Sequence, residues 1–419
     1  MKKALLFLFL TISTVSLSQT LNGPESIEWD AANSRWLIGN KGNGTILSRS
    51  ETGILSNFVS GIPSGPYGIE ILGNVLYSCE GGFIRGYNLT SGSTVFTLNL
   101  NGTFLNGLTS DGVGFLYATD FTAKKIFKVD VNAVTFSTIA TGLAKTPNGI
   151  IYDGENNRCV YVTWGTNAPI NAIDLTTNAI STVLATTLSN CDGITRDTCG
   201  NYYVSSWGNN KLNKFDKSLT GTFTALAGTL SSPADLGAKL GTLTDVIGNT
   251  NSNNTITLTT INRPNAVISQ DSNSLSTTIT FSTYQWYFNG SLIQNATSQS
   301  FTPTENGEYY CVVGYDNCQL VSNALIFPSL NNTSFESNSR FKLYPNPSRN
   351  WITISFNGNL DGEYSIINQL GQTVNSGKVS IATQSIKQFD ISVSNLKTGS
   401  YILQLKSNGV IENIKFLKE

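Results

Sequence analysis

The chain has 419 residues, only 13% of them charged, and its formal net charge is −1. It therefore carries no electrostatic signature of a protein that binds nucleic acid or an anionic membrane surface. It also contains no histidine, which excludes Ser-His-Asp and Cys-His catalysis and every zinc site that needs an imidazole.

Residues 1–18 are predicted to be a signal peptide. Lys2 and Lys3 precede an apolar stretch that begins at Ala4, and small residues before Gln19 offer a cleavage site. No later segment is long and apolar enough to span a membrane, so no transmembrane segment is expected in the mature chain. Six cysteines, an even number, fit an oxidising compartment.

One short phrase recurs at intervals of about 40 residues through the first part of the chain. Its copies are Pro24-Glu25-Ser26-Ile27, Pro66-Tyr67-Gly68-Ile69, Leu105-Asn106-Gly107-Leu108, Pro147-Asn148-Gly149-Ile150, Cys191-Asp192-Gly193-Ile194 and, degraded, Pro233-Ala234-Asp235-Leu236. Short runs of strand-forming residues separated by Asn and Gly turns lie between the copies. Residues 19–262 are therefore predicted to form a six-bladed β-propeller. The sixth blade is one strand short, and residues 19–22 are expected to supply that strand and close the ring.

The phrase begins the innermost strand of each predicted blade, so its second residues are expected to ring the mouth of the central channel. These residues are Glu25, Tyr67, Asn106, Asn148, Asp192 and Ala234. Four of them offer the carboxylate and amide oxygens that suit Ca²⁺ or Mg²⁺, namely Glu25, Asn106, Asn148 and Asp192. The alternative is that Asn and Asp at this position end a turn and satisfy its backbone groups.

The same phrases resemble two kinds of known propeller. Glu25-Ser-Ile-Glu-Trp29, Asn106, Pro147-Asn-Gly-Ile150 and Asp192-Gly-Ile194 resemble the metal-binding positions of the senescence-marker/gluconolactonase family. Copies such as PNGI also resemble NHL repeats. The first resemblance implies that Glu25, Asn106, Asn148 and Asp192 hold a divalent metal, with Asp192 as the general base for lactone hydrolysis.

Two tryptophans, Trp164 and Trp207, follow equivalent predicted strands of neighbouring blades, each before a glycine. They are expected either to form an aromatic platform for a sugar or peptide or to pack between blades. Tyr67, at the predicted channel mouth, is a further contact candidate.

Residues 263–328 are predicted to be an immunoglobulin-like domain. Trp286 and the later run from Gly307 to Cys311 resemble strands C and F of such a sandwich, with Tyr309 at the tyrosine-corner position. The earlier strand has no cysteine, so Cys318, across an expected hairpin, is favoured as the partner of Cys311. Cys191 and Cys199 bracket the first hairpin of the fifth blade and are a second candidate pair.

Residues 329–340 are predicted to be a polar linker, and residues 341–419 a small β-sandwich. The landmarks of this last segment are Leu343-Tyr-Pro-Asn-Pro347, Asn368-Gln-Leu-Gly-Gln372, Leu396-Lys-Thr-Gly-Ser-Tyr401 and a lysine-containing end. In this order they resemble the C-terminal sorting domain of type IX secretion in Bacteroidetes. The resemblance implies that the type IX machinery is a partner and that the product is secreted or attached to the outer-membrane surface.

The expected fold class is thus all-β: a propeller, an immunoglobulin-like sandwich and a small C-terminal sandwich. The favoured function is binding of an extracellular protein or carbohydrate partner by the propeller face, with Ca²⁺ a candidate ion in the channel. The alternative is a metal-dependent hydrolase of the gluconolactonase type with Asp192 as base. A purely structural surface protein is the third hypothesis.

Overall fold

A computed structural model describes residues 19–226, 228–327, 341–356, 360–381, 388–407 and 410–419. The predicted signal peptide (1–18) and linker (329–340) lie outside these residues. Over the described ranges the chain is almost entirely β, and its helical segment is one 3₁₀ turn, η1 (Gly154–Asn156). None of the described segments is a helix long and apolar enough to cross a membrane.

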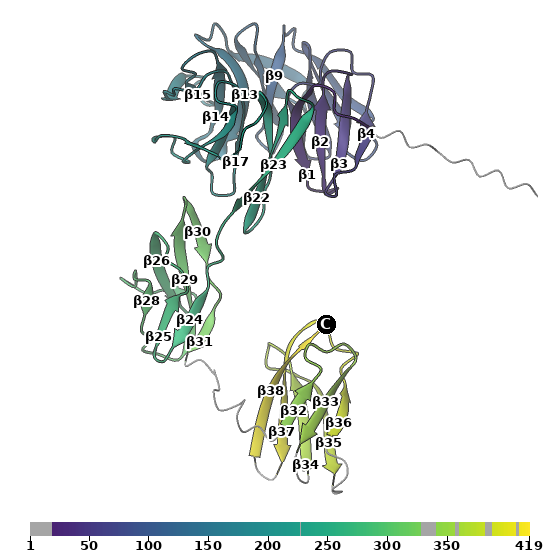
Figure 1. Ribbon diagram of the computed structural model, residues 1–419, viewed down its shortest axis with the longest axis vertical. Helices are drawn as coiled ribbons and strands as arrows, with labels where there is room; N and C mark the ends of the chain where they lie inside the picture. Colours follow the sequence, from purple (N-terminus) through teal and green to yellow (C-terminus); the bar gives the residue numbers. More distant parts are fainter. Residues whose placement is uncertain (1–18, 227, 328–340, 357–359, 382–387, 408–409) are drawn as a thin grey trace, which may run out of the picture. The chain divides into compact units, whose positions relative to one another are not determined.

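Six antiparallel sheets follow one another from residue 24 to residue 262, a stretch in which all residues but 227 are described (Figure 1). The first three sheets are β1 (Pro24–Asp30), β2 (Arg35–Asn40), β3 (Thr45–Ser50) and β4 (Leu55–Val59); β5 (Ile69–Leu72), β6 (Val75–Glu80), β7 (Phe83–Asn88) and β8 (Thr94–Asn99); and β9 (Leu105–Ser110), β10 (Phe115–Asp120), β11 (Lys125–Asp130) and β12 (Thr135–Ala140). The next three are β13 (Thr146–Asp153), β14 (Arg158–Trp164), β15 (Ile170–Asp174) and β16 (Ile180–Leu184); β17 (Cys191–Arg196), β18 (Tyr202–Ser206), β19 (Lys211–Phe215) and β20 (Thr224–Ala225); and β21 (Pro233–Lys239), β22 (Thr244–Asn251) and β23 (Thr255–Asn262).

The first strands of these sheets contact one another in a closed cycle, β1 to β5, β9, β13, β17, β21 and back to β1. Hydrophobic cores lie between neighbouring sheets, as expected for the layers of a propeller. The closing core packs Ile27, Trp36 and Ile38 of the first sheet against Val246 and Leu258 of the last. The fold is therefore an all-β propeller closed by contact between its N-terminal and C-terminal sheets.

The expectation that residues 19–22 form a strand of the last sheet is wrong, because that sheet has three strands and residues 19–22 have no strand structure. The backbone of this segment is satisfied instead by the end of β2 and the turn that follows it. Asn22 N donates to Asn40 Oδ1 (2.6 Å), and Gly42 N donates to Asn22 O (2.9 Å). Leu21 joins the closing core.

The glycine of the recurring phrase is required by the close approach of the inner strands. A Cβ on Gly107 would lie 2.4 Å from Asn148 O, and one on Gly149 would lie 2.5 Å from Asp192 O. Hydroxyls then tie the strands together: Gly107 N donates to Thr119 Oγ1 (2.9 Å), and Thr119 Oγ1 donates to Asn148 O (2.7 Å). This packing fixes the position of each residue that precedes the glycine.

Residues 264–327 form two further sheets. Their strands are β24 (Ile268–Asp271), β25 (Ser274–Thr277) and β28 (Ser300–Phe301) in one sheet, and β27 (Ser291–Leu292), β26 (Thr283–Phe288), β29 (Gly307–Tyr315), β30 (Cys318–Val321) and β31 (Leu325–Phe327) in the other. Trp286 is fully buried, lies opposite Cys311 in the β26–β29 pair and stacks on Phe301 at a centroid distance of 5.7 Å. This core is that of a small β-sandwich.

The last segment is a sandwich of its own. Its sheets are β32 (Phe341–Tyr344), β33 (Trp351–Phe356) and β36 (Gln388–Ser392), and β35 (Thr373–Ile381), β34 (Leu360–Ile367), β37 (Gly399–Ser407) and β38 (Val410–Lys418). Ile352 and Ile354 of the first sheet share one buried core with Ile366, Leu403 and Phe416 of the second.

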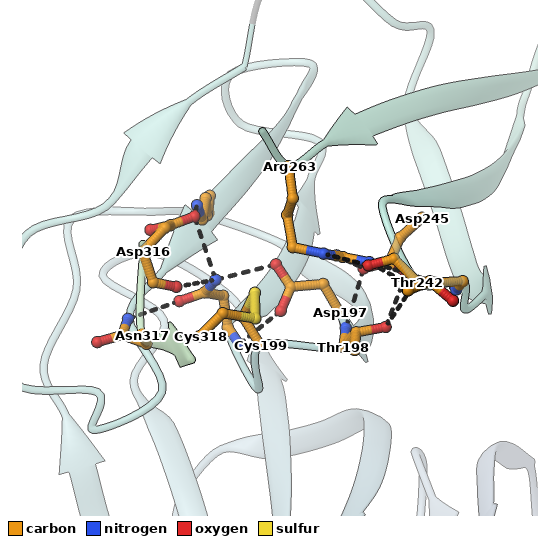
Figure 2. Close-up of a disulfide and its surroundings, with 12 residues drawn as sticks. Asp197, Thr198, Cys199, Thr242, Asp245, Arg263, Asp316, Asn317 and Cys318 are labelled. Atoms are coloured by element: carbon orange, nitrogen blue, oxygen red, sulfur yellow. Dashed lines mark hydrogen bonds and ion pairs between the residues drawn. A yellow bond between two sulfur atoms is a disulfide. The ribbon is translucent and has the colours of Figure 1, made fainter. Parts of the chain in front are cut away.

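A disulfide joins Cys199, in the β17–β18 turn, to Cys318 at the start of β30 (Figure 2). Both pairs expected from the sequence are therefore wrong, and their other members, Cys191 and Cys311, are buried thiols. The register explains the difference. Cys311 lies beside Ser322 rather than opposite Cys318, because Ser322 N donates to Cys311 O (2.9 Å) and Cys311 N donates to Ser322 Oγ (2.9 Å). Cys191 pairs with Ser206 at the far end of β17 from Cys199.

The hairpin tip that carries Cys318 docks beside the disulfide. Asp316 and Asn317 both have positive φ, as a two-residue type I′ turn requires. Asn317 Nδ2 donates to Asn201 Oδ1 (2.8 Å), and Asp316 forms an ion pair with Lys214 of β19. The β29–β30 hairpin is thus held covalently and by polar contacts to the fifth sheet.

Candidate functional site

Three of the four predicted oxygen donors form one hydrogen-bonded chain that crosses three sheets. Asn106 Nδ2 donates to Asn148 Oδ1 (2.6 Å), and Asn148 Nδ2 donates to Asp192 Oδ1 (3.1 Å). Asn148 Nδ2 also donates to the backbone oxygen of Cys191 (3.3 Å). Of these three hydrogen bonds, only this one satisfies a backbone group, as the turn interpretation predicts. All three side chains are buried. The inner strands β9, β13 and β17 bring them together because each strand presents the residue before its crowded glycine.

The fourth donor, Glu25, meets a residue that sequence reasoning missed. Lys41 Nζ lies 2.6 Å from Glu25 Oε2 and 5.9 Å from the centroid of the Tyr67 ring. Burial raises the pKa of the Asp192 carboxyl well above its ordinary value, and the neighbouring Glu25 and Asp235 carboxylates add to the rise. Lys41 and a hydrogen bond from Trp207 oppose that rise. Glu25, Lys41 and Asp192 are thus one electrostatic unit.

The donor set suits a hard divalent cation in chemistry and charge, since it offers two carboxylates and two amide oxygens. Lys41 supplies a competing positive charge at Glu25, and the Asn148 oxygen already accepts from Asn106. Across the described residues, no group of three or more His, Cys, Asp or Glu side chains could hold a metal ion, so a cation here would depend on the two asparagines. Binding would require the Lys41 ammonium to move aside.

Replacing Lys41 with methionine is expected to strengthen Ca²⁺ binding, because Glu25 and Asp192 then lose a neighbouring positive charge. At a Ca²⁺ concentration about a hundred times its Kd, the ion should stabilise this variant by about 2.7 kcal/mol and raise its Tm by about 5–10 °C. Differential scanning calorimetry in Ca²⁺ and in excess chelator measures this. The matched control is Lys41→Arg, which keeps the charge. Equal curves for Lys41→Met in Ca²⁺ and in chelator would contradict a metal role for these residues.

A chain of aromatic side chains runs beside the same residues. Edge-to-face and tilted contacts link each ring to the next, with centroid distances of 4.6, 5.6, 5.9 and 5.1 Å along Tyr67, Phe104, Phe121, Trp164 and Trp207. We call these five residues the aromatic belt. Four of its members are half-buried, and Trp207 is 36% exposed. The belt begins at Tyr67, beside Lys41, and ends at Trp207, which donates its indole N–H to Asp192.

Most of the belt comes from one structural position. Phe121 directly follows β10, Trp164 ends β14 and Trp207 directly follows β18, so each stands where the second strand of its sheet ends. Lys41 directly follows β2 and is the equivalent residue of the first sheet. Of these four, sequence reasoning singled out only the two tryptophans. Aligning the residues that follow each second strand would have revealed Lys41 and Phe121.

Comparison with protein families gives one match. Residues 342–419 match the secretion system C-terminal sorting domain. This segment is a sorting domain. The protein is accordingly handled by the type IX secretion machinery and is secreted or placed at the outer-membrane surface. A comparison with curated proteins finds no match.

Several solved structures resemble part of the chain. A chain of a nidogen/laminin complex is 14% identical with a TM-score of 0.44, covering 53% of this chain and 91% of its own. The gluconolactonase XC5397 from Xanthomonas campestris is 14% identical with a TM-score of 0.49, covering 58% and 87%. A luciferin-regenerating enzyme is 12% identical with a TM-score of 0.45, covering 55% and 84%.

Proposed function

We propose that this is a secreted or cell-surface carbohydrate-binding protein, and that the aromatic belt with its adjoining polar residues is the binding face. In this proposal the six sheets are the blades of a six-bladed propeller, and residues 263–328 are an immunoglobulin-like module that carries no part of the site. The observation that supports it most is the belt itself, five linked aromatic rings that border buried carboxylates and amides.

The two parts of the face match the two parts of a sugar ring. Half-exposed aromatic rings contact the C–H faces of a pyranose and bury them at low conformational cost. Carboxylate and amide groups such as Glu25, Asn106 and Asp192 accept from or donate to hydroxyls and fix orientation. A protein partner is the other candidate, and the low proportion of charged residues favours the sugar, because it leaves little for charge complementarity to a protein surface.

The test is a glycan array probed with the purified protein, followed by calorimetric titration of the best oligosaccharide. Trp164→Ala with Trp207→Ala is expected to weaken binding by tenfold or more, at least about 1.4 kcal/mol, because the stacking surface is lost. The matched control is Trp351→Ala, since Trp351 is 57% exposed in the sorting domain and outside the proposed face. An array without a binder, or equal losses in both variants, would contradict the proposal.

A metal-dependent hydrolase is the second candidate, favoured by the convergence of Asn106, Asn148 and Asp192 and by the raised pKa of Asp192. Here Glu25, Asn106, Asn148 and Asp192 would hold the cation, which would supply Lewis-acid activation, and Asp192 would accept a proton. Purified protein should then hydrolyse aldonolactones in Ca²⁺ or Mg²⁺, and Asp192→Asn should abolish turnover. Sugar binding that survives Asp192→Asn without any lactone turnover would leave binding as the function.

A further inference from the structure

A second site lies at the opposite end of the inner strands. Ring residues such as Asn106 and Asp192 stand near the starts of β9 and β17, whereas Ser110 and Arg196, the last residues of these strands, line a cavity of about 700 Å³. The disulfide-linked hairpin contributes Asn317 and Cys318 to its wall. A cavity of this size falls within the range of about 300–1,000 Å³ that is typical of small-molecule sites.

Five carboxylates line this cavity, and two of them are Glu155 and Asp197. The other three are Glu28, Glu70 and Asp235, of which Glu70 accepts a hydrogen bond from Ser110 Oγ (2.6 Å). Asp235 occupies the position held by the crowded glycine in the four preceding phrases, so it places a side chain where those four copies have none. No described residue forms an ion pair with any of the three. The basic residues of the same cavity are already engaged, because Arg196 pairs with Asp153 (3.3 Å) and Lys217 with Glu155 (3.9 Å).

Part of the remaining wall is apolar, beside polar residues such as Thr109, Tyr152 and Gln319. Ile69, Leu108, Ile150, Ile194 and Leu236 line the cavity and are all buried. Among them lies Thr195, which also lines the cavity and is 6% exposed, and its hydroxyl has no hydrogen-bond partner within the described part of the chain. A threonine hydroxyl that lines a cavity can accept a hydrogen bond from a ligand. The cavity thus presents three carboxyl groups without an ion-pair partner, a hydroxyl open to a ligand and a group of isoleucine and leucine side chains.

We propose that this cavity binds a small aliphatic amine, whose protonated amino groups pair with Glu28, Glu70 and Asp235 and whose methylenes cover the isoleucine and leucine wall. The Thr195 hydroxyl accepts one ammonium hydrogen. This proposal does not rest on the carbohydrate face, although Asp235 also acts electrostatically on Asp192 of that face. It gives the propeller channel a different ligand at each end.

The acidity of the carboxyls supports this assignment and sets its pH dependence. Burial raises the pKa of Glu70 and of Asp235 to about 7, and burial with the neighbouring Glu70 and Asp235 carboxylates raises that of Glu28 well above its ordinary value. Glu70 and Asp235 are therefore largely protonated below pH 6 and become ionised as the pH rises through about 7. The other charged residues that line the cavity are Arg196, Lys217, Glu155 and Asp197. Amine binding should accordingly strengthen from pH 6 to pH 8.

The experiment is calorimetric titration of the purified protein at pH 8 and pH 6 with putrescine, cadaverine and spermidine. 1,4-Butanediol is the uncharged control, because it matches putrescine in length and lacks the ammonium groups. We expect at least one amine to bind at pH 8, to bind at least tenfold more weakly at pH 6, and to displace any weak binding of the diol. Absence of binding by all three amines at pH 8, or equal binding of amine and diol, would overturn the proposal.

Two near-isosteric variants place the amine in the cavity. Asp235→Asn and Glu70→Gln each remove one buried carboxyl and should weaken amine binding at least tenfold. Carbohydrate binding should stay unchanged in Glu70→Gln, whereas Asp235 also acts electrostatically on Asp192. The control is Glu51→Gln, whose carboxylate is exposed and pairs with Lys239. Equal losses in Glu51→Gln and Asp235→Asn would show nonspecific attraction to surface charge and overturn the proposal. Undiminished binding in both Asp235→Asn and Glu70→Gln would do the same.

Discussion

Replacing Arg263 with methionine is expected to lower the free energy of unfolding by about 3–5 kcal/mol, the cost of breaking a buried ion pair by removing one partner. The Arg263 and Asp245 side chains are 2% and 0% exposed and form an ion pair (Figure 2). The guanidinium also donates to the backbone oxygens of Gly241 and Thr242. Without the guanidinium, the buried Asp245 carboxylate and the backbone oxygens of Gly241 and Thr242 all lose a hydrogen-bond donor.

The free energy of unfolding of the wild type should depend on pH through the same Arg263–Asp245 ion pair. Burial alone would raise the pKa of Asp245, but hydrogen bonds from Arg263, Thr198 and Gly241 lower it below its ordinary value. A lowered folded-state pKa contributes stability that is present above about pH 4 and is lost as the pH falls further. The difference between wild type and Arg263→Met should therefore be full at pH 7 and shrink toward pH 3.

Urea unfolding of both proteins at these pH values measures the difference. The matched control is Arg349→Met, because Arg349 is 83% exposed and its pair with Glu419 lies on the surface of the sorting domain. That control should cost less than about 1 kcal/mol. A loss of similar size in both variants would show that the buried pair is not what stabilises the end of β23.

Replacing Cys318 with serine is expected to destabilise the region around the fifth sheet by about 2–4 kcal/mol, because the disulfide closes a loop between cysteines 119 residues apart. The polar contacts of the hairpin tip remain, with Asn317 bonded to Asn201 and Asp316 paired with Lys214. The sandwich of residues 264–327 should therefore stay folded but separate more readily from the propeller, and its thermal transition should move away from that of the propeller.

Calorimetry with and without a reductant provides the control. Reductant should shift the wild-type curve to that of Cys318→Ser and leave the variant unchanged, because the other four cysteines are buried thiols. Burial raises the pKa of Cys191 to about 12 and that of Cys311 to about 11, so neither is a thiolate at neutral pH. A wild-type curve that does not respond to reductant would contradict a stabilising role for the bridge.

The repeating architecture could be predicted from the sequence because its cause is local. The glycine that follows four of the six ring residues is required by contact with the next inner strand, so the period of about 40 residues follows the sheets directly. The convergence of Asn106, Asn148 and Asp192 follows from the same repetition. The all-β class and the C-terminal sorting domain were likewise predictable, the latter from landmarks in one short segment.

Features that depend on contacts between distant segments could not be predicted. The partner of Cys199 is 119 residues away, and nothing near either cysteine in sequence indicates the pairing. Residues 19–22 are held by hydrogen bonds to a side chain and to a turn. Such contacts leave no alternation of apolar and polar residues in the sequence. Lys41 lies outside the recurring phrase. The position of Asp235 could have been noticed in the sequence, because it is the only residue that replaces the glycine in copies two to six of the phrase. In the sequence alone, however, that copy looks like a degraded repeat.

The central claim, that the aromatic belt is a carbohydrate-binding face, is tested most directly by a crystal structure of the protein with the best oligosaccharide from the array. We expect sugar rings in contact with Trp164 and Trp207, with at least one hydroxyl hydrogen-bonded to Asp192 or Glu25. A sugar bound elsewhere on the chain, with the belt and its polar neighbours uncovered, would contradict the claim.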